Sequence, residues 1–123
     1  MAMSEAKIQN FTDLVTWQIA HALVLEVYKL TKRFPPEERF GLVSQMRRCG
    51  VSITSNVAEG FSRRTGKEKR RFYDIAIGSL FELQNQLLLS KDLGYLDQPR
   101  FDEIQLVTLR VNRLLNGLIK SVI

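Results

Sequence analysis

The spacing of its apolar residues is what most constrains how this chain can fold. Along four long stretches these residues recur at steps of three and four, as they do on one face of an α-helix. In the first stretch Ala20, Leu23, Val27, Leu30 and Phe34 share one such face. The pattern leaves little room for strands. It predicts four helices, covering residues 13–33, about 36–60, 66–93 and 99–122.

Residues that start and stop helices flank these stretches. Thr12 is the predicted N-cap of the first helix, and Pro36 suits the first turn of the second. Gly60 is predicted to lie just beyond the end of the second helix. Thr65 and Glu68 have the spacing of a capping box, which would open the third helix. The connections between helices are therefore predicted to be short.

Short connections between long amphipathic helices favour antiparallel neighbours. We therefore expect an all-α fold, specifically an up-down-up-down antiparallel four-helix bundle. The length of 123 residues suits one domain. We assign residues 11–123 to this domain and residues 1–10 to a flexible N-terminal tail.

The composition excludes several classes of protein. Hydrophobic residues make up 45% of the chain and charged residues 25%, which is close to the globular average and unlike disordered or fibrous proteins. Apolar runs are only a few residues long, whereas a membrane span needs about 20. No signal peptide is visible, and the single cysteine cannot form an internal disulfide. We expect a soluble cytoplasmic protein with no membrane contact.

The net charge of +5 comes from one segment, residues 63–71. It holds six of the 18 basic residues and one of the 13 acidic residues, so the rest of the chain has 12 of each. Such a patch favours polyanions, RNA or DNA first, unless it is only a solvated loop and helix start. No sequence-reading motif accompanies it, so we expect the patch to recognise the backbone and the shape of the nucleic acid rather than its base sequence. The candidate nucleic-acid-binding residues are Arg63, Arg64, Lys67, Lys69, Arg70 and Arg71.

A stripe of polar residues follows one side of the second predicted helix. Arg48, Ser52, Asn56 and Glu59 lie about one turn apart. Such stripes usually face water, but here the middle residues are small and neutral. We interpret the stripe as a buried or subunit-facing seam with a structural role. The hypothesis is that Arg48 pairs with Glu82 of the third helix, or with Glu59 of a neighbouring copy.

Little in the chain indicates catalysis. His21 is the only histidine, and the sequence offers it no assignable nucleophile. One histidine and one cysteine cannot make a tetrahedral zinc site, and no phosphate-binding loop is visible. Glu59 and Glu82 could in principle form an acid/base pair, but a nearby arginine would hold both ionised. We expect no catalytic residue, no metal, no cofactor and no enzymatic activity.

Several short segments of the chain occur in a familiar order and at a familiar spacing. They are Phe11–Gln18, Phe34–Leu42, Gln45–Arg48, Ser52–Gly60, Ile75–Leu83 and Leu93–Leu96. Together they resemble a bacterial four-helix bundle family that is encoded by intervening sequences of 23S rRNA and is also labelled S23 ribosomal protein. The resemblance covers residues 11–96, while the last helix matches only in pattern.

The resemblance implies assembly as a ring-shaped homopentamer with no established catalytic activity. Accessory proteins of diversity-generating retroelements are similar in fold, and they form basic pentamers that bind nucleic acid and a reverse transcriptase. The resemblance therefore adds a reverse transcriptase-like partner to RNA or DNA as an expected contact. We expect a non-catalytic, oligomeric, nucleic-acid-binding protein, with RNA favoured. The alternatives are a protein-interaction scaffold with no nucleic-acid role and an enzyme with an unrecognised carboxylate site.

Overall fold

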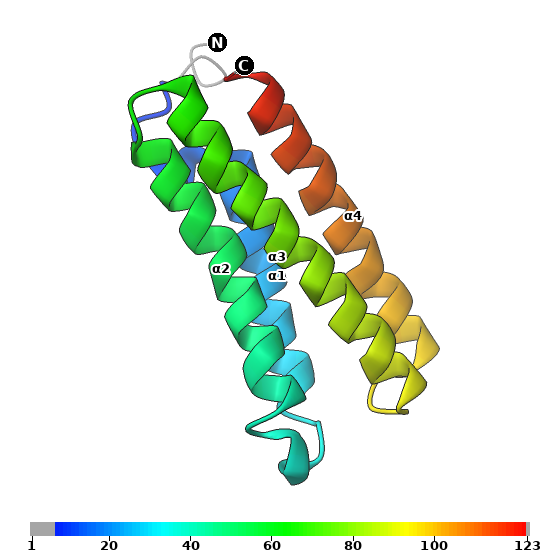
Figure 1. The fold of residues 1–123 in the computed structure, drawn as a ribbon. Coiled ribbons are helices and arrows are strands. Elements are labelled where there is room, and N and C mark those ends of the chain that lie inside the picture. The colour runs from blue at the N-terminus through cyan, green and yellow to red at the C-terminus, as the bar shows by residue number, and fades with distance from the viewer. Residues whose placement is uncertain (1–6, 123) are drawn as a thin grey trace.

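The computed structural model describes residues 7–122 and contains four α-helices within them. They are α1 (Val15–Thr31), α2 (Leu42–Ser62), α3 (Gly66–Asp92) and α4 (Gln98–Lys120), as Figure 1 shows. Two single turns of 3-10 helix, η2 (Phe11–Asp13) and η3 (Pro36–Glu38), precede α1 and α2. No strand occurs in the described part of the chain. The all-α prediction is confirmed. Residues 1–6 of the predicted tail lie outside the described residues.

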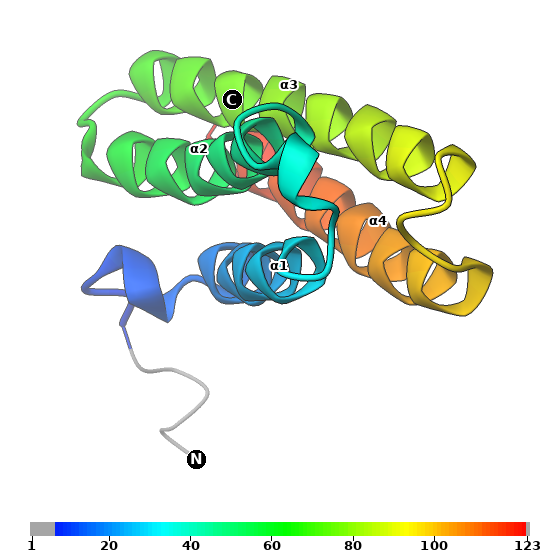
Figure 2. The same cartoon turned by 90° about the horizontal axis from the view of Figure 1, so that it is seen from below.

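The four helices surround one apolar core. Each helix contacts the next along the chain, and α1 also contacts α4. Figure 2 shows this arrangement from below. The contact between α2 and α3 is the most extensive. The largest side chains in the core are fully buried and come from all four helices; among them are Leu23, Val27, Met46, Ile53, Leu80, Leu83, Leu87, Val111 and Leu115.

The start of α1 differs from the prediction. Thr12 is not an N-cap; it lies inside η2, whose N-cap is Asn10. The Asn10 side chain accepts a hydrogen bond from the Thr12 backbone N–H, and Asp13 completes a capping box with the Asn10 backbone. Leu14 then occupies the N-cap position of α1 without a side-chain cap. The 3-10 turn therefore ends before the α-helix begins.

The start of α2 also differs from the prediction, and the Glu38 side chain accepts a hydrogen bond at the position where the helix begins. Pro36 opens η3 rather than the long helix, and α2 begins six residues later at Leu42. The Glu38 Oε1 atom accepts a hydrogen bond from the Leu42 backbone N–H at 3.2 Å, and its Oε2 atom accepts one from the Tyr95 hydroxyl at 2.9 Å. One carboxylate thus satisfies a first-turn donor of α2 and ties this connection to the α3–α4 connection.

At the far end of α2, the predicted terminator is part of the helix. Gly60 is buried inside α2, which continues to Ser62. The reason is a close approach to α3: a Cβ atom at Gly60 would lie 2.5 Å from Cε1 of Tyr73. Tyr73 is the buried aromatic residue at this position, whereas the neighbouring Phe72 is half-buried. Gly60 therefore admits the Tyr73 ring rather than ending the helix.

The predicted cap of α3 is confirmed in one of its two bonds. The Thr65 hydroxyl accepts a hydrogen bond from the Glu68 backbone N–H at 3.1 Å. The Glu68 carboxylate, however, meets the Thr65 hydroxyl at 3.0 Å rather than its backbone N–H. The helix begins at Gly66, as predicted, and that residue lies against the backbone of Val122 beyond the end of α4.

The Gly60–Tyr73 contact predicts opposite effects for the same substitution at two glycines. In a helix interior, Gly→Ala normally stabilises by about 0.5–1 kcal/mol. Gly60→Ala should instead lower the free energy of unfolding by about 1–3 kcal/mol, because the new methyl group would overlap a buried ring and approach the Lys69 carbonyl oxygen at 3.2 Å. Gly78→Ala, where no atom lies within 4 Å, is the matched control and should stabilise. Urea denaturation measures both, and shifts of the same sign would contradict this account.

Candidate nucleic-acid interface and polar seam

The basic segment, residues 63–71, forms the turn between α2 and α3 together with the first turns of α3. Figure 1 shows this turn at the end of the molecule where α4 finishes. The N-terminus of α3 lies within the segment, and its free backbone N–H groups add positive potential to that of the side chains. The fold therefore gathers these charges at one end.

Two of the six basic side chains serve the fold itself. Arg63 forms an ion pair with Glu59 at 2.8 Å, and its guanidinium lies 4.7 Å from the centre of the Phe72 ring. Lys69 donates a hydrogen bond from Nζ to the backbone carbonyl oxygen of Phe61 at 2.8 Å. That bond satisfies a carbonyl in the last turn of α2, where cations are favoured. Both side chains are half-buried.

The other four basic side chains are exposed. Arg70 forms a long ion pair with Asp74, at 3.8 Å. Arg64, Lys67 and Arg71 have no ion pair with any residue between 7 and 122. Positions 67 and 71 are one helical turn apart, and position 64 immediately precedes the capped start of α3. These three form the part of the basic segment best placed to meet phosphates.

The middle of the predicted polar seam is held within the chain. The hydroxyl oxygens of Ser52 and Ser79 lie 2.7 Å apart across α2 and α3. The Asn56 amide donates to the Ser52 backbone carbonyl oxygen at 2.8 Å and to its hydroxyl at 3.1 Å. All three residues are half-buried or buried. The Ser52–Ser79 pair therefore joins α2 to α3, and Asn56 supports Ser52 from within α2.

The charged ends of the seam are arranged differently from the hypothesis. Arg48 and Glu82 are exposed and line one hollow of about 320 Å³, but no ion pair joins them in the described structure. Glu82 instead accepts a hydrogen bond from the Cys49 thiol, with Sγ and Oε2 3.6 Å apart. Glu59 pairs with Arg63 of its own chain. Pairing with a neighbouring copy stays a prediction.

The surroundings of Cys49 keep it a thiol. Burial raises the pKa of Cys49 above its ordinary value of 9.0, and the Glu82 carboxylate raises it further. The Gln86 amide and the Arg48 charge act in the opposite direction without reversing the result. The thiolate, which is the nucleophilic form, is therefore scarce at neutral pH.

The remaining candidates for chemistry are dispersed. His21 is exposed and stacks on Trp17, with ring centroids 4.6 Å apart and planes 15° apart. Glu59 and Glu82, the two carboxylates considered for acid/base chemistry, bond to different partners. No group of three or more potential ligands in the described part of the chain could hold a metal ion.

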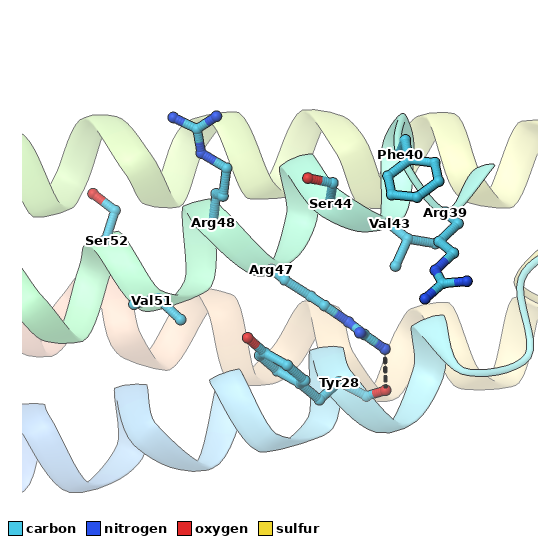
Figure 3. A pocket seen from close by; sticks show the side chains of 9 residues that line it. All are labelled: Tyr28, Arg39, Phe40, Val43, Ser44, Arg47, Arg48, Val51 and Ser52. Atoms are coloured by element: carbon cyan, nitrogen blue, oxygen red, sulfur yellow. Dashed lines mark hydrogen bonds between the residues drawn. The ribbon is translucent and has the colours of Figure 1, made fainter.

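One surface feature was missed by the sequence analysis. A groove of about 650 Å³ lies between α1 and α2, and its rim carries the exposed ring of Phe40 and three arginines, Arg39, Arg47 and Arg48. Figure 3 shows it from close by. The available signal was the position of Phe40, which lies between the proline turn and Gly41 and so belongs to no helical face.

The described structure is all-helical, and the segment that accounts for the net charge of +5 lies at one end of it. The sequence profile described as 23S rRNA-intervening sequence protein matches residues 12–117. The chain therefore belongs to that family. The match extends beyond residues 11–96, which carry the resemblance seen in the sequence, and includes most of α4.

A solved structure supports the fold. It is a crystal structure of a protein of unknown function from the S23 ribosomal protein family of Bacteroides thetaiotaomicron, 22% identical in sequence. The match covers 86% of this chain and 96% of that one, with a TM-score of 0.80. No curated protein matches the chain. Within residues 7–122, no helix has the length and apolar character needed to cross a membrane.

The contacts around Cys49 predict opposite pKa shifts for two neighbouring substitutions. Glu82→Gln removes a negative charge that disfavours the thiolate, so the pKa of Cys49 should fall. Arg48→Gln removes a positive charge that favours the thiolate, so the pKa should rise. The rate of alkylation by iodoacetamide, followed against pH, reports both. If both variants moved the midpoint in the same direction, the assigned neighbours would be wrong.

Proposed function

We propose that this protein is a non-catalytic, oligomeric nucleic-acid-binding protein, with RNA the favoured ligand and DNA the other. The observation that carries the proposal is the grouping of Arg64, Lys67 and Arg71 at the capped N-terminus of α3 without an ion pair to any described residue. Cations that have no carboxylate partner can neutralise phosphates and release their counterions.

The proposal assigns two roles within the basic segment. Arg64, Lys67, Arg71 and the weakly paired Arg70 contact phosphates, while Arg63 and Lys69 hold the turn that presents them. Recognition is of the nucleic-acid backbone and shape, because no sequence-reading motif accompanies the segment. The non-catalytic part is supported by the dispersed carboxylates and by the high pKa of Cys49.

Assembly is the second part of the proposal. The up-down-up-down antiparallel order is supported by pairs that rise along α3 as they fall along α2, namely Ser52 with Ser79, Cys49 with Glu82 and Met46 with Ser90. A homopentameric ring is implied by the family resemblance, and the exposed ends of the polar seam suit a contact between copies. A ring would repeat the basic segment on one assembly, which raises affinity for a long polyanion.

The remaining parts of the proposal concern partners and location. We include a reverse transcriptase-like partner by analogy with the accessory proteins of diversity-generating retroelements. A cytoplasmic location is supported by the single cysteine, which is free. A protein-interaction scaffold is the second candidate. It is favoured by apolar side chains that stay exposed on the outer faces, such as Leu106 on α4 and Phe81 on α3.

Neutralising the three unpaired cations tests the nucleic-acid role. The variant Arg64→Gln/Lys67→Gln/Arg71→Gln should bind structured RNA more weakly and with a smaller salt dependence. Each lost phosphate contact lowers the slope of log affinity against log salt by about 0.9 on a duplex. Fluorescence anisotropy of labelled duplex RNA and DNA at several salt concentrations measures the slope.

The matched control is Arg100→Gln/Arg110→Gln/Arg113→Gln. It removes the same charge from exposed positions on α4 and should change the slope less. Equal losses in the two triple variants would show that only net charge matters. No binding by the unmodified protein at low salt would overturn the nucleic-acid role and leave the scaffold.

A charge reversal at the seam tests assembly. Arg48→Glu changes an exposed side chain, so each subunit should keep its fold while the ring loses a contact and dissociates. Native mass spectrometry should then show smaller species, with an unchanged circular dichroism spectrum. The double variant Arg48→Glu/Glu59→Arg restores opposite charges across the contact that the seam hypothesis places between copies, and it should recover the larger species. A ring that survives the single reversal would place the contact between copies elsewhere.

A further inference from the structure

A second cationic region lies at the other end of α2, away from the basic segment. Its main part is the groove between α1 and α2 that carries Phe40 on its rim. A second hollow of about 270 Å³ continues it and shares Arg39, Val43 and Arg47 with it. Together they make one surface, which we name the arginine groove. It runs from Ser52 to the proline turn.

The charge of the arginine groove has one sign. Its lining includes Lys32, Arg39, Arg47 and, at its border with the polar seam, Arg48. Within residues 7–122 no acidic side chain lines either hollow. The nearest carboxylate in sequence that could neutralise them, that of Glu38, is engaged by the Leu42 N–H and the Tyr95 hydroxyl.

One of these cations is fixed in place. The Arg47 Nε atom donates to the Thr31 hydroxyl at 3.0 Å, and Nη2 donates to the Tyr28 carbonyl oxygen at 3.4 Å. Its guanidinium also lies over the Tyr28 ring, 4.5 Å from the centroid. Figure 3 shows Arg47 extended towards Tyr28 and Arg48 pointing to the opposite side of α2. The groove therefore has one positive charge held in a fixed position.

Phe40 gives the groove an aromatic platform. Phe40 is 88% exposed, the highest value among the large apolar residues between positions 7 and 122. The Arg39 guanidinium lies 5.4 Å from the centre of the Phe40 ring. A ring held next to cations with no carboxylate in the lining matches the way single-stranded nucleic acids are bound, in which bases stack on aromatic rings and arginines meet the phosphates.

We infer that the arginine groove binds an unpaired nucleotide of a single-stranded nucleic acid, with the base on Phe40 and the phosphates at Arg39 and Arg47. A second copy of the chain fits this surface less well, because burying these cations against protein would require carboxylates to pair with them. The inference concerns residues separate from the basic segment and does not depend on duplex binding there.

The test uses a short single-stranded oligoribonucleotide that carries 2-aminopurine, whose fluorescence falls on stacking. Phe40→Ala and Phe40→Leu should each weaken its binding by about 5- to 150-fold, the range reported for loss of one stacked base. Leucine keeps an apolar side chain but has no π face, so it separates stacking from general hydrophobic contact. Phe40→Trp should preserve binding and quench the probe at least as strongly.

Phe81→Ala is the matched control, since it removes an exposed aromatic ring from α3 and should leave binding unchanged. Binding of blunt duplex RNA should be unaffected by every Phe40 variant, so failure of the basic-segment proposal and failure of this one are distinguishable. Unchanged affinity in Phe40→Ala, or full affinity in Phe40→Leu, would overturn the inference. So would a change in oligomeric mass on Phe40→Ala without a change in affinity, which would mark the groove as a contact between copies.

Discussion

The close approach of α2 to α3 is the interaction on which the rest of the structure depends. It is made by small residues: Gly60 admits the Tyr73 ring, and the hydroxyls of Ser52 and Ser79 meet at 2.7 Å. Larger side chains at these points would separate the helices and open the core on both sides. The two hydroxyls pair with each other, so neither loses its hydrogen bond when the helices come together.

This approach also determines where the charge lies. With α2 and α3 in contact almost to their ends, only a short turn connects them, and six basic residues fall within it and the first turns of α3. Repulsion among them is offset locally, because Arg63 pairs with Glu59 and Lys69 binds the final carbonyls of α2. The remaining cations lie outside these contacts and face solvent. Arg63 and Lys69 thus stabilise the turn, and the turn presents the other four basic residues of the segment to solvent.

The sequence predicts the helices and their core well, because apolar periodicity over some twenty residues is a strong signal. It predicts individual contacts poorly. Tyr73 rather than Phe72 is buried, because Gly60 on the facing helix leaves room for that ring, and no local pattern contains this information. The local signals at Thr12 and Pro36 predict helix starts, but both residues lie in separate 3-10 turns whose end points depend on Asn10 and Glu38. For the candidate site, the basic segment can be recognised because its basic residues are close together in the sequence. The residues of the arginine groove are distant in the sequence and come together only when α1 packs against α2.

The surfaces along α2 differ in a way that bears on how an assembly could work. At about 1.5 Å per residue the helix is roughly 30 Å long. Its C-terminal end adjoins the basic segment, its side towards α3 carries the polar seam, and its start adjoins the arginine groove on the side towards α1. Arg47 and Arg48 are consecutive and so diverge by about 100°. Arg47 lines the groove, whereas Arg48 lines both the groove and the hollow that contains Glu82. A contact between copies at the seam would therefore reach the edge of the arginine groove at Arg48 and Ser52, whereas the basic segment lies beyond the other end of α2.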